Sequence, residues 1–89
     1  MVQVSDLVRS INGRDAGKAF FVVGVDGEMA LIADGRGRRL ENPKRKKVKH
    51  LEFLTVSSGR TAEKLRQGER VTNSEIRRAI ADMCGSSEA

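Results

Sequence analysis

The sequence has little of several residue types on which active sites and disulfide-rich folds depend. Its 89 residues include one cysteine, Cys84, one histidine, His50, and neither tryptophan nor tyrosine. A single cysteine cannot form an intramolecular disulfide, which argues against a secreted, disulfide-stabilised domain. Neither His50 nor Cys84 has a companion at the spacing of metal ligands. We therefore expect a cytoplasmic protein that is not an enzyme and that carries no metal and no cofactor.

Long apolar segments are also missing. No run approaches the roughly 20 apolar residues of a membrane-spanning helix. The stretch from Met1 to Gly13 contains Asp6 and Arg9 where a signal peptide needs an apolar core. We expect no membrane association, and a chain of this length has room for one small domain with an appendage.

Basic charge is abundant but unevenly distributed. The formal net charge of +5 divides into −2 for residues 1–35, +7 for residues 36–50 and zero for the remainder. In the window 36–50, eight basic residues stand against Glu41 alone. Such an excess of positive charge is unfavourable because the basic residues repel one another. A bound polyanion would remove this repulsion and release its own counterions. The window therefore predicts a nucleic-acid-binding surface, with a solvated charged loop as the alternative.

Short apolar runs broken by glycine predict strands and turns as far as Phe53. Asn12-Gly13, Asp26-Gly27 and Asp34-Gly35 are turn dipeptides, and Asp26-Gly27 is the most explicit hairpin signal. Gly24 indicates a bulge in the most apolar run. The predicted strands are Leu7 to Ile11, Ala19 to Val25, Glu28 to Ala33, Arg36 to Leu40 and Val48 to Leu54.

Five short strands favour a small antiparallel barrel, because closing the sheet removes exposed edges. The predicted fold is mainly β, with an SH3-like five-stranded antiparallel barrel over residues 1–55 and a linker with a short C-terminal helical extension over residues 56–89. An OB-like barrel fits less well, since it usually needs a longer chain and an intervening helix.

Two short helices are predicted in the extension. Thr61 to Gln67 forms the first, ended by Gly68, and Asn73 or Ser74 caps the second. The second helix has one narrow apolar face, formed by Ile76, Ala79, Ile80 and Met83. So narrow a face must dock on something. It could pack on the barrel or bind a partner, and the sequence leaves both open.

The segment Gly13-Arg14-Asp15-Ala16-Gly17-Lys18 joins the first two predicted strands. It is no nucleotide-binding phosphate loop, because Ala19 and a strand follow where that motif needs Ser or Thr and a helix. Its glycines allow a tight turn. They either serve the turn alone or also bring backbone N–H groups, with Arg14 and Lys18, close to a phosphate.

Together with the first strand and the run Phe20-Phe21-Val22-Val23, this segment resembles the KOW motif of ribosomal proteins and transcription-elongation factors. The resemblance continues through Ala33-Asp34-Gly35, Arg38-Arg39-Leu40, Pro43-Lys44 and Lys47-Val48-Lys49-His50-Leu51. Over residues 5–54 the chain is similar to small bacterial KOW-domain RNA-binding proteins related to an archaeal and eukaryotic large-subunit ribosomal protein. The resemblance implies an SH3-like barrel, RNA as the ligand, and association with the ribosome or ribosomal RNA.

The scarcity of aromatic residues predicts how RNA is bound. Phe20, Phe21 and Phe53 lie in strand runs where burial in the core is expected, which leaves few rings for stacking on bases. Contacts to phosphate and 2′-hydroxyl groups of a folded RNA are therefore favoured, with Arg38 and Arg39 suited to bidentate phosphate contacts. The candidate RNA-binding residues are Arg14, Lys18, Arg36, Arg38, Arg39, Lys44, Arg45, Lys46, Lys47, Lys49 and His50.

Two alternatives remain open. The chain could be a protein-interaction module that binds a protein through the barrel or through Ile76, Ile80 and Met83, although few aromatics argue against a proline-peptide groove. Duplex DNA would satisfy the same electrostatics and is disfavoured by the KOW resemblance.

Overall fold

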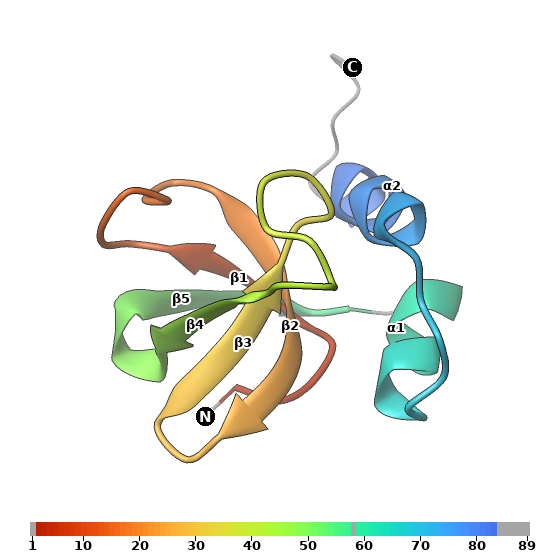
Figure 1. The fold of residues 1–89 in the computed structure, drawn as a ribbon, viewed down its shortest axis with the longest axis horizontal. Helices are drawn as coiled ribbons and strands as arrows, with labels where there is room; N and C mark the ends of the chain where they lie inside the picture. The colour runs from red at the N-terminus through yellow and green to blue at the C-terminus, as the bar shows by residue number, and fades with distance from the viewer. Residues whose placement is uncertain (1, 58, 84–89) are drawn as a thin grey trace.

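The computed structural model describes residues 2–57 and 59–83 and shows one five-stranded antiparallel sheet flanked by two helices (Figure 1). The strands are β1 (Asp6–Ser10), β2 (Ala19–Asp26), β3 (Met29–Ala33), β4 (Lys44–Lys47) and β5 (Leu51–Val56). A 3-10 turn, η1 (Val48–His50), joins β4 to β5, and the helices are α1 (Arg60–Arg66) and α2 (Asn73–Met83). The predicted mainly-β fold with a helical extension is confirmed at this level.

The β2–β3 hairpin forms where the sequence predicts it. Asp26 pairs with Met29 across the turn, and Gly27 has a φ of 61°, the left-handed conformation that glycine adopts without strain. The register of the two strands shifts between Val22 and Gly24, which confirms the predicted bulge.

The predicted strand from Arg36 to Leu40 is wrong, because local hydrogen bonds fold this segment into a loop. The Asp34 carboxylate accepts hydrogen bonds from the backbone N–H groups of Arg36 at 2.9 Å and Arg38 at 3.0 Å. Such a side-chain acceptor competes with a strand ladder for the same donors. The fourth strand forms later, over Lys44–Lys47, and pairs with β3. We call residues 34–43 the basic loop.

The predicted last strand, Val48 to Leu54, is displaced in the same direction. Val48–His50 form η1, and the strand runs over Leu51–Val56. The N–H of Val48 bonds to the carbonyl oxygen of Glu28, which holds the turn against the β2–β3 hairpin.

The sheet is strongly curled. Its strand order is β4-β3-β2-β1-β5, so β4 and β5 are the two outermost strands. Four inter-strand spacings would place them about 19 Å apart in a flat sheet. Lys47 ends β4 and Leu51 begins β5, and a chain of four residues spans at most about 14 Å. The sheet must therefore bend until its edges approach, although β4 and β5 are not paired with each other in the described residues.

The inside of the curl is filled by apolar side chains from every part of the sheet except β4. This inner core is centred on Val8, Phe20 and Ile32, all fully buried, and Val48 of η1 packs against it. Its buried members are Val2, Val8, Phe20, Val22, Ala30, Ile32 and Leu51. Residues far apart in the sequence thus share one core, which fixes the curl.

The opposite face of the sheet is also buried where β1, β2 and β3 lie side by side. Leu7, Phe21 and Ala33 lie side by side in register on that face and are at most 2% exposed. Helix α2 packs against β2 (Figure 1). Its Ile76 is fully buried. Helix α2 therefore covers this part of the face. Of the two possibilities open for its apolar face, packing on the sheet holds for Ile76, while Ile80 and Met83 are half-buried.

Hydrogen bonds attach both helices to the strands and loops beneath them. Arg66 of α1 donates to the hydroxyl of Ser5 at 2.9 Å and to the carbonyl oxygen of Ser57 at 3.1 Å. Asn73 of α2 accepts from the backbone N–H of Leu40 at 2.9 Å. The basic loop is thus held by the first turn of α2.

The boundaries of α1 lie one residue before the predicted Thr61 and Gln67, and the cap of α2 also differs from the prediction. Helix α1 ends before Gly68, which has a φ of 74° as predicted for a helix terminus. The start of α2 is capped by Thr72 and not by Asn73 or Ser74. The Thr72 hydroxyl accepts from the N–H of Glu75 at 3.1 Å, and the Glu75 carboxylate accepts from the N–H of Thr72 at 2.9 Å. Thr72-Asn73-Ser74-Glu75 is therefore a capping box, a signal that the sequence contains.

Neither described helix has the length and apolar character needed to cross a bilayer.

Candidate nucleic-acid interface

The basic residues of β4 divide between the two faces of the sheet. Lys44 and Lys46 pair with Ile32 and Ala30, whose side chains belong to the inner core, so these two lysines lie on the inner side of the sheet edge. Both are half-buried, whereas Arg45 and Lys47 are exposed on the outer side. Because β4 is an outermost strand, both rows border the same edge.

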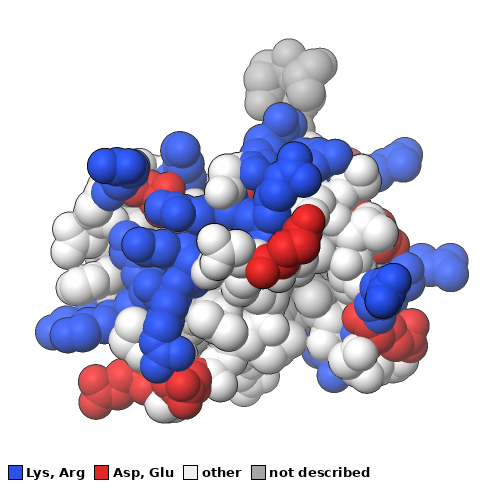
Figure 2. Space-filling view, in the orientation of Figure 1, with Lys and Arg blue, Asp and Glu red and all other residues white. Residues whose placement is uncertain are grey.

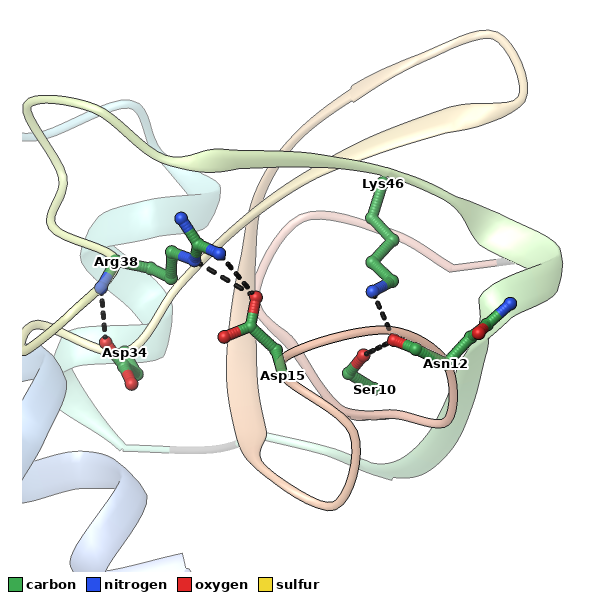
Figure 3. A network of polar contacts seen from close by, with 6 residues as sticks. All are labelled: Ser10, Asn12, Asp15, Asp34, Arg38 and Lys46. Atoms are coloured by element: carbon green, nitrogen blue, oxygen red, sulfur yellow. Dashed lines mark hydrogen bonds and ion pairs between the residues drawn. The ribbon is translucent and has the colours of Figure 1, made fainter.

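Arg38 is bound to a carboxylate and does not project freely. Its Nε and Nη2 atoms donate to Oδ2 of Asp15 at 3.1 and 2.8 Å (Figure 3). Asp15 lies in the loop between β1 and β2 and is 5% exposed. Burial raises the pKa of the Asp15 carboxyl, but the hydrogen bonds and charge of Arg38, with Lys18 and Lys46 nearby, outweigh it and hold the pKa below its usual value.

Lys46 also contacts the loop between β1 and β2. Its Nζ donates to the carbonyl oxygen of Asn12, which accepts a second hydrogen bond from the Ser10 hydroxyl at 3.1 Å (Figure 3). Two basic residues of the window 36–50 therefore hold this loop in place, through Asp15 and Asn12. Neither partner was predicted from the sequence. An acidic residue in an otherwise basic turn was a signal for Asp15, whereas Asn12 accepts through its backbone carbonyl oxygen, which no side chain indicates.

The loop between β1 and β2 uses its own N–H groups internally. Gly17 donates to the carbonyl oxygen of Ser10, Lys18 to that of Asp15, and Ala16 to that of Gly13. Gly13 and Gly17 have φ values of 80° and 89°, which the tight turn of both interpretations requires. The side chains of Arg14 and Lys18 are exposed.

The remaining candidates lie in the basic loop and in η1. Arg36 and Arg39 are exposed in the basic loop, and Lys49 is exposed in η1. His50 is half-buried, and its carbonyl oxygen accepts from the N–H of Ile11 at 3.0 Å. Within the described residues, none of the three exposed cations forms an ion pair with a carboxylate.

These positions produce a largely basic face. Figure 2 shows Lys and Arg side chains gathered over β4 and over the basic loop, with few acidic side chains among them. Arg45 forms an exposed ion pair with Asp26 at 3.1 Å, which is weak because both groups are in solvent. We call the exposed or half-buried cations of the loop between β1 and β2, the basic loop, β4 and η1 the basic surface, leaving out Arg38 because it is paired with Asp15. Its members are Arg14, Lys18, Arg36, Arg39, Lys44, Arg45, Lys46, Lys47 and Lys49.

The prediction that all three phenylalanines are buried is wrong for Phe53. Phe20 and Phe21 are fully buried, but Phe53 is 51% exposed. It lies on β5, an outermost strand, where no further strand covers its ring. One exposed ring does not make the series of stacking platforms that bind successive bases.

The predicted protein-binding face on α2 is reduced by packing. Ile76 is fully buried, while Ile80 and Met83 are half-buried. Cys84 lies outside the described residues. Among those that are described, no three His, Cys, Asp or Glu side chains are grouped so that they could hold a metal ion.

Comparison of the sequence with protein-family models gave no match, and comparison with curated proteins gave none.

Proposed function

We propose that this chain is a KOW-type RNA-binding protein that associates with the ribosome or ribosomal RNA by gripping the phosphate backbone of structured RNA. The observation that carries the proposal is the basic surface itself. It consists of cations from four separate segments of the chain, and few carboxylates neutralise them. Holding so many like charges together is unfavourable in the free protein and becomes favourable beside a polyanion.

We also propose that the curled sheet is an SH3-like barrel. In support, η1 joins the two outermost strands over three residues, and one apolar core fills the curl. The loop between β1 and β2, where the KOW resemblance is centred, has its two glycines at positive φ.

Phosphate contact fits the surface better than base stacking does. Phe53 is the one aromatic ring exposed among the described residues, whereas the cations are numerous. Arg38 is not part of the proposed contact, because the carboxylate of Asp15 neutralises its charge. Of the arginines predicted to bind phosphate in a bidentate manner, Arg39 is the one that is free to do so.

The proposal is tested by filter-binding titrations against a folded ribosomal RNA fragment over a range of salt concentrations. If about six phosphates are neutralised, log K falls against log salt with a slope on the order of −5. The double substitution Lys44→Ala with Lys47→Ala removes one cation from each face of β4. We expect it to lower affinity roughly 50-fold at 0.1 M salt and to reduce the slope by about 2.

The matched control is Arg60→Ala with Arg78→Ala, which removes one exposed cation from each of the two helices. Its affinity should stay within about threefold of the wild type, because charges far from the contact are screened. Equal losses in the two double variants, or no loss in either, would sink the proposal. Duplex DNA that competes as well as the RNA fragment would redirect it to DNA.

The alternative of a protein-interaction module has less support. Ile76, one of the three residues of α2 expected to bind a protein, is fully buried within the molecule itself.

A further inference from the structure

A basic hollow lies at the border of the window 36–50, where the start of β2, the basic loop and α2 meet. It has a volume of about 330 Å³. Three of its lining residues are cations, Lys18, Arg36 and Arg77, and one, Asp34, is acidic. The cations come from three separate segments, and Arg77 belongs to the part of the chain whose net charge is zero.

Arg77 is held in a fixed position at this hollow. Its Nη1 donates to the carbonyl oxygen of Gly35 at 2.6 Å, and its Nη2 donates to the Ser74 hydroxyl at 2.9 Å. A guanidinium has five N–H donors, so about three remain for a ligand. A side chain already ordered by its own protein loses little entropy when it binds an anion.

The walls of the hollow are fixed to each other. Gly35 has a φ of 78°, and a side chain at this position would collide with the backbone of Asn73 and the side chain of Arg77. Asn73 in turn bonds to the N–H of Leu40. The basic loop and α2 therefore approach as closely as their backbones allow, and the hollow exists before any ligand arrives.

The acidic residue of the lining does not cancel its positive charge. Asp34 Oδ1 accepts from the backbone N–H groups of Arg36 and Arg38, so this oxygen faces the loop's own donors. With Lys18, Arg36 and Arg77 counted against Asp34, the formal charge of the lining is +2. An anion with several oxygens suits such a site.

We propose that this hollow binds a backbone phosphate of the RNA, so that the interface extends from β4 and the basic loop onto α2, with Arg77 as the recognising side chain. This inference rests on the proposed function. It adds a residue and an element that the charge distribution of the sequence does not indicate.

The test compares Arg77→Gln with Arg78→Gln by the same RNA titrations. Both substitutions remove one charge from α2, but Arg78 is exposed and does not line the hollow. We expect Arg77→Gln to weaken binding about tenfold at 0.1 M salt and to reduce the salt slope by about 1, and Arg78→Gln to change neither. If the two variants bind alike while Lys44→Ala with Lys47→Ala still weakens binding, the hollow is not a phosphate site and the proposed function stands. If the wild type does not bind RNA, both proposals fall.

Arg77→Lys separates charge from support of the loop. It keeps the positive charge and can still donate to the Gly35 carbonyl oxygen. Arg77→Gln could weaken RNA binding by destabilising the protein, which a lower melting temperature would reveal. In that case a wild-type salt slope in Arg77→Lys supports the proposed phosphate site. A salt slope that stays reduced in Arg77→Lys overturns it. Titration with a free mononucleotide distinguishes a phosphate of the RNA backbone from the phosphate of a small ligand. If Arg77→Gln loses binding of the mononucleotide but keeps the wild-type affinity for RNA, the inference is also overturned.

Discussion

At the scale of single residues, the ion pair of Asp15 and Arg38 shows that a basic residue of the window 36–50 can stabilise the fold instead of binding a ligand. The Asp15 side chain is 8% exposed and that of Arg38 is 30% exposed, so the ion pair is mostly removed from water. Breaking such a pair leaves a buried carboxylate without its partner, which is far less favourable than losing a surface ion pair.

We therefore expect Arg38→Met to lower the free energy of unfolding by about 1–3 kcal/mol at pH 7. The pKa of Asp15 is lowered in the folded protein, so its contribution is present above the unfolded pKa of about 3.9 and is lost as pH falls through the folded value. The difference between Arg38→Met and the wild type should then shrink below about pH 4. Urea unfolding at pH 7 and pH 3 measures both effects.

The control for this substitution is Arg36→Met, an exposed arginine of the same loop with no ion pair in the described residues. It should leave the free energy of unfolding within about 0.5 kcal/mol of the wild type. A loss in Arg38→Met no larger than in the control would show that the pair contributes nothing.

At the scale of elements, the position of α2 depends on its first turn. Thr72 and Glu75 form the reciprocal hydrogen bonds of the capping box, and Glu75 also accepts from Lys64 of α1 at 2.8 Å. The hydrogen bond from Lys64, with those from Thr72, lowers the pKa of Glu75. The same turn carries Asn73, which holds the basic loop. The start of α2 therefore links α1, α2 and the loop.

Substitution of Thr72 by alanine should destabilise the protein by about 1 kcal/mol, because one N–H of the first turn loses its acceptor. Amide hydrogen exchange should be faster in α2 than in the strands, since the effect is local. Ser74→Ala removes only the hydroxyl contact with Arg77 and should have the smaller effect. A larger loss in Ser74→Ala would place the cap where the sequence first indicated it.

Element boundaries followed the sequence where local signals agreed with long-range pairing. The β2–β3 hairpin is such a case, since Gly27 favours the turn and the apolar runs beside it favour strands. The segment Arg36 to Leu40 is the opposite case. Its residues can form a strand, but the N–H groups of Arg36 and Arg38 donate to the carboxylate of Asp34 and are therefore not available for pairing with β3.

At the scale of the whole molecule, the middle of the sheet is covered on both faces. One face surrounds the inner core, and the other, with Leu7 and Phe21, lies under the helices. A sheet buried on both faces makes the helical extension part of the packing and not a free appendage. Ile76 is the fully buried residue of α2.

Ile76→Ala should therefore lower the free energy of unfolding by about 2–5 kcal/mol, the usual range for emptying a buried isoleucine site. Thermal unfolding should show one transition for sheet and helices together. The control is Ile11→Ala, because Ile11 is 56% exposed and its loss leaves no cavity. Equal melting temperatures for the two variants, or a separate early transition for the helices, would contradict joint packing.

The sequence by itself determined the turns, the apolar strands and the concentration of positive charge in residues 36–50. These features depend on neighbouring residues, such as Gly27 in its turn or the run from Phe20 to Val23. Only the tertiary structure decided which cations are free, because the partner of Arg38 lies 23 residues away in another loop. It also decided that Phe53 is exposed at a sheet edge and that Arg77 joins the basic loop. The physical reason is the same in each case: strand order and helix docking set the surroundings of a side chain, and contacts between distant segments fix both.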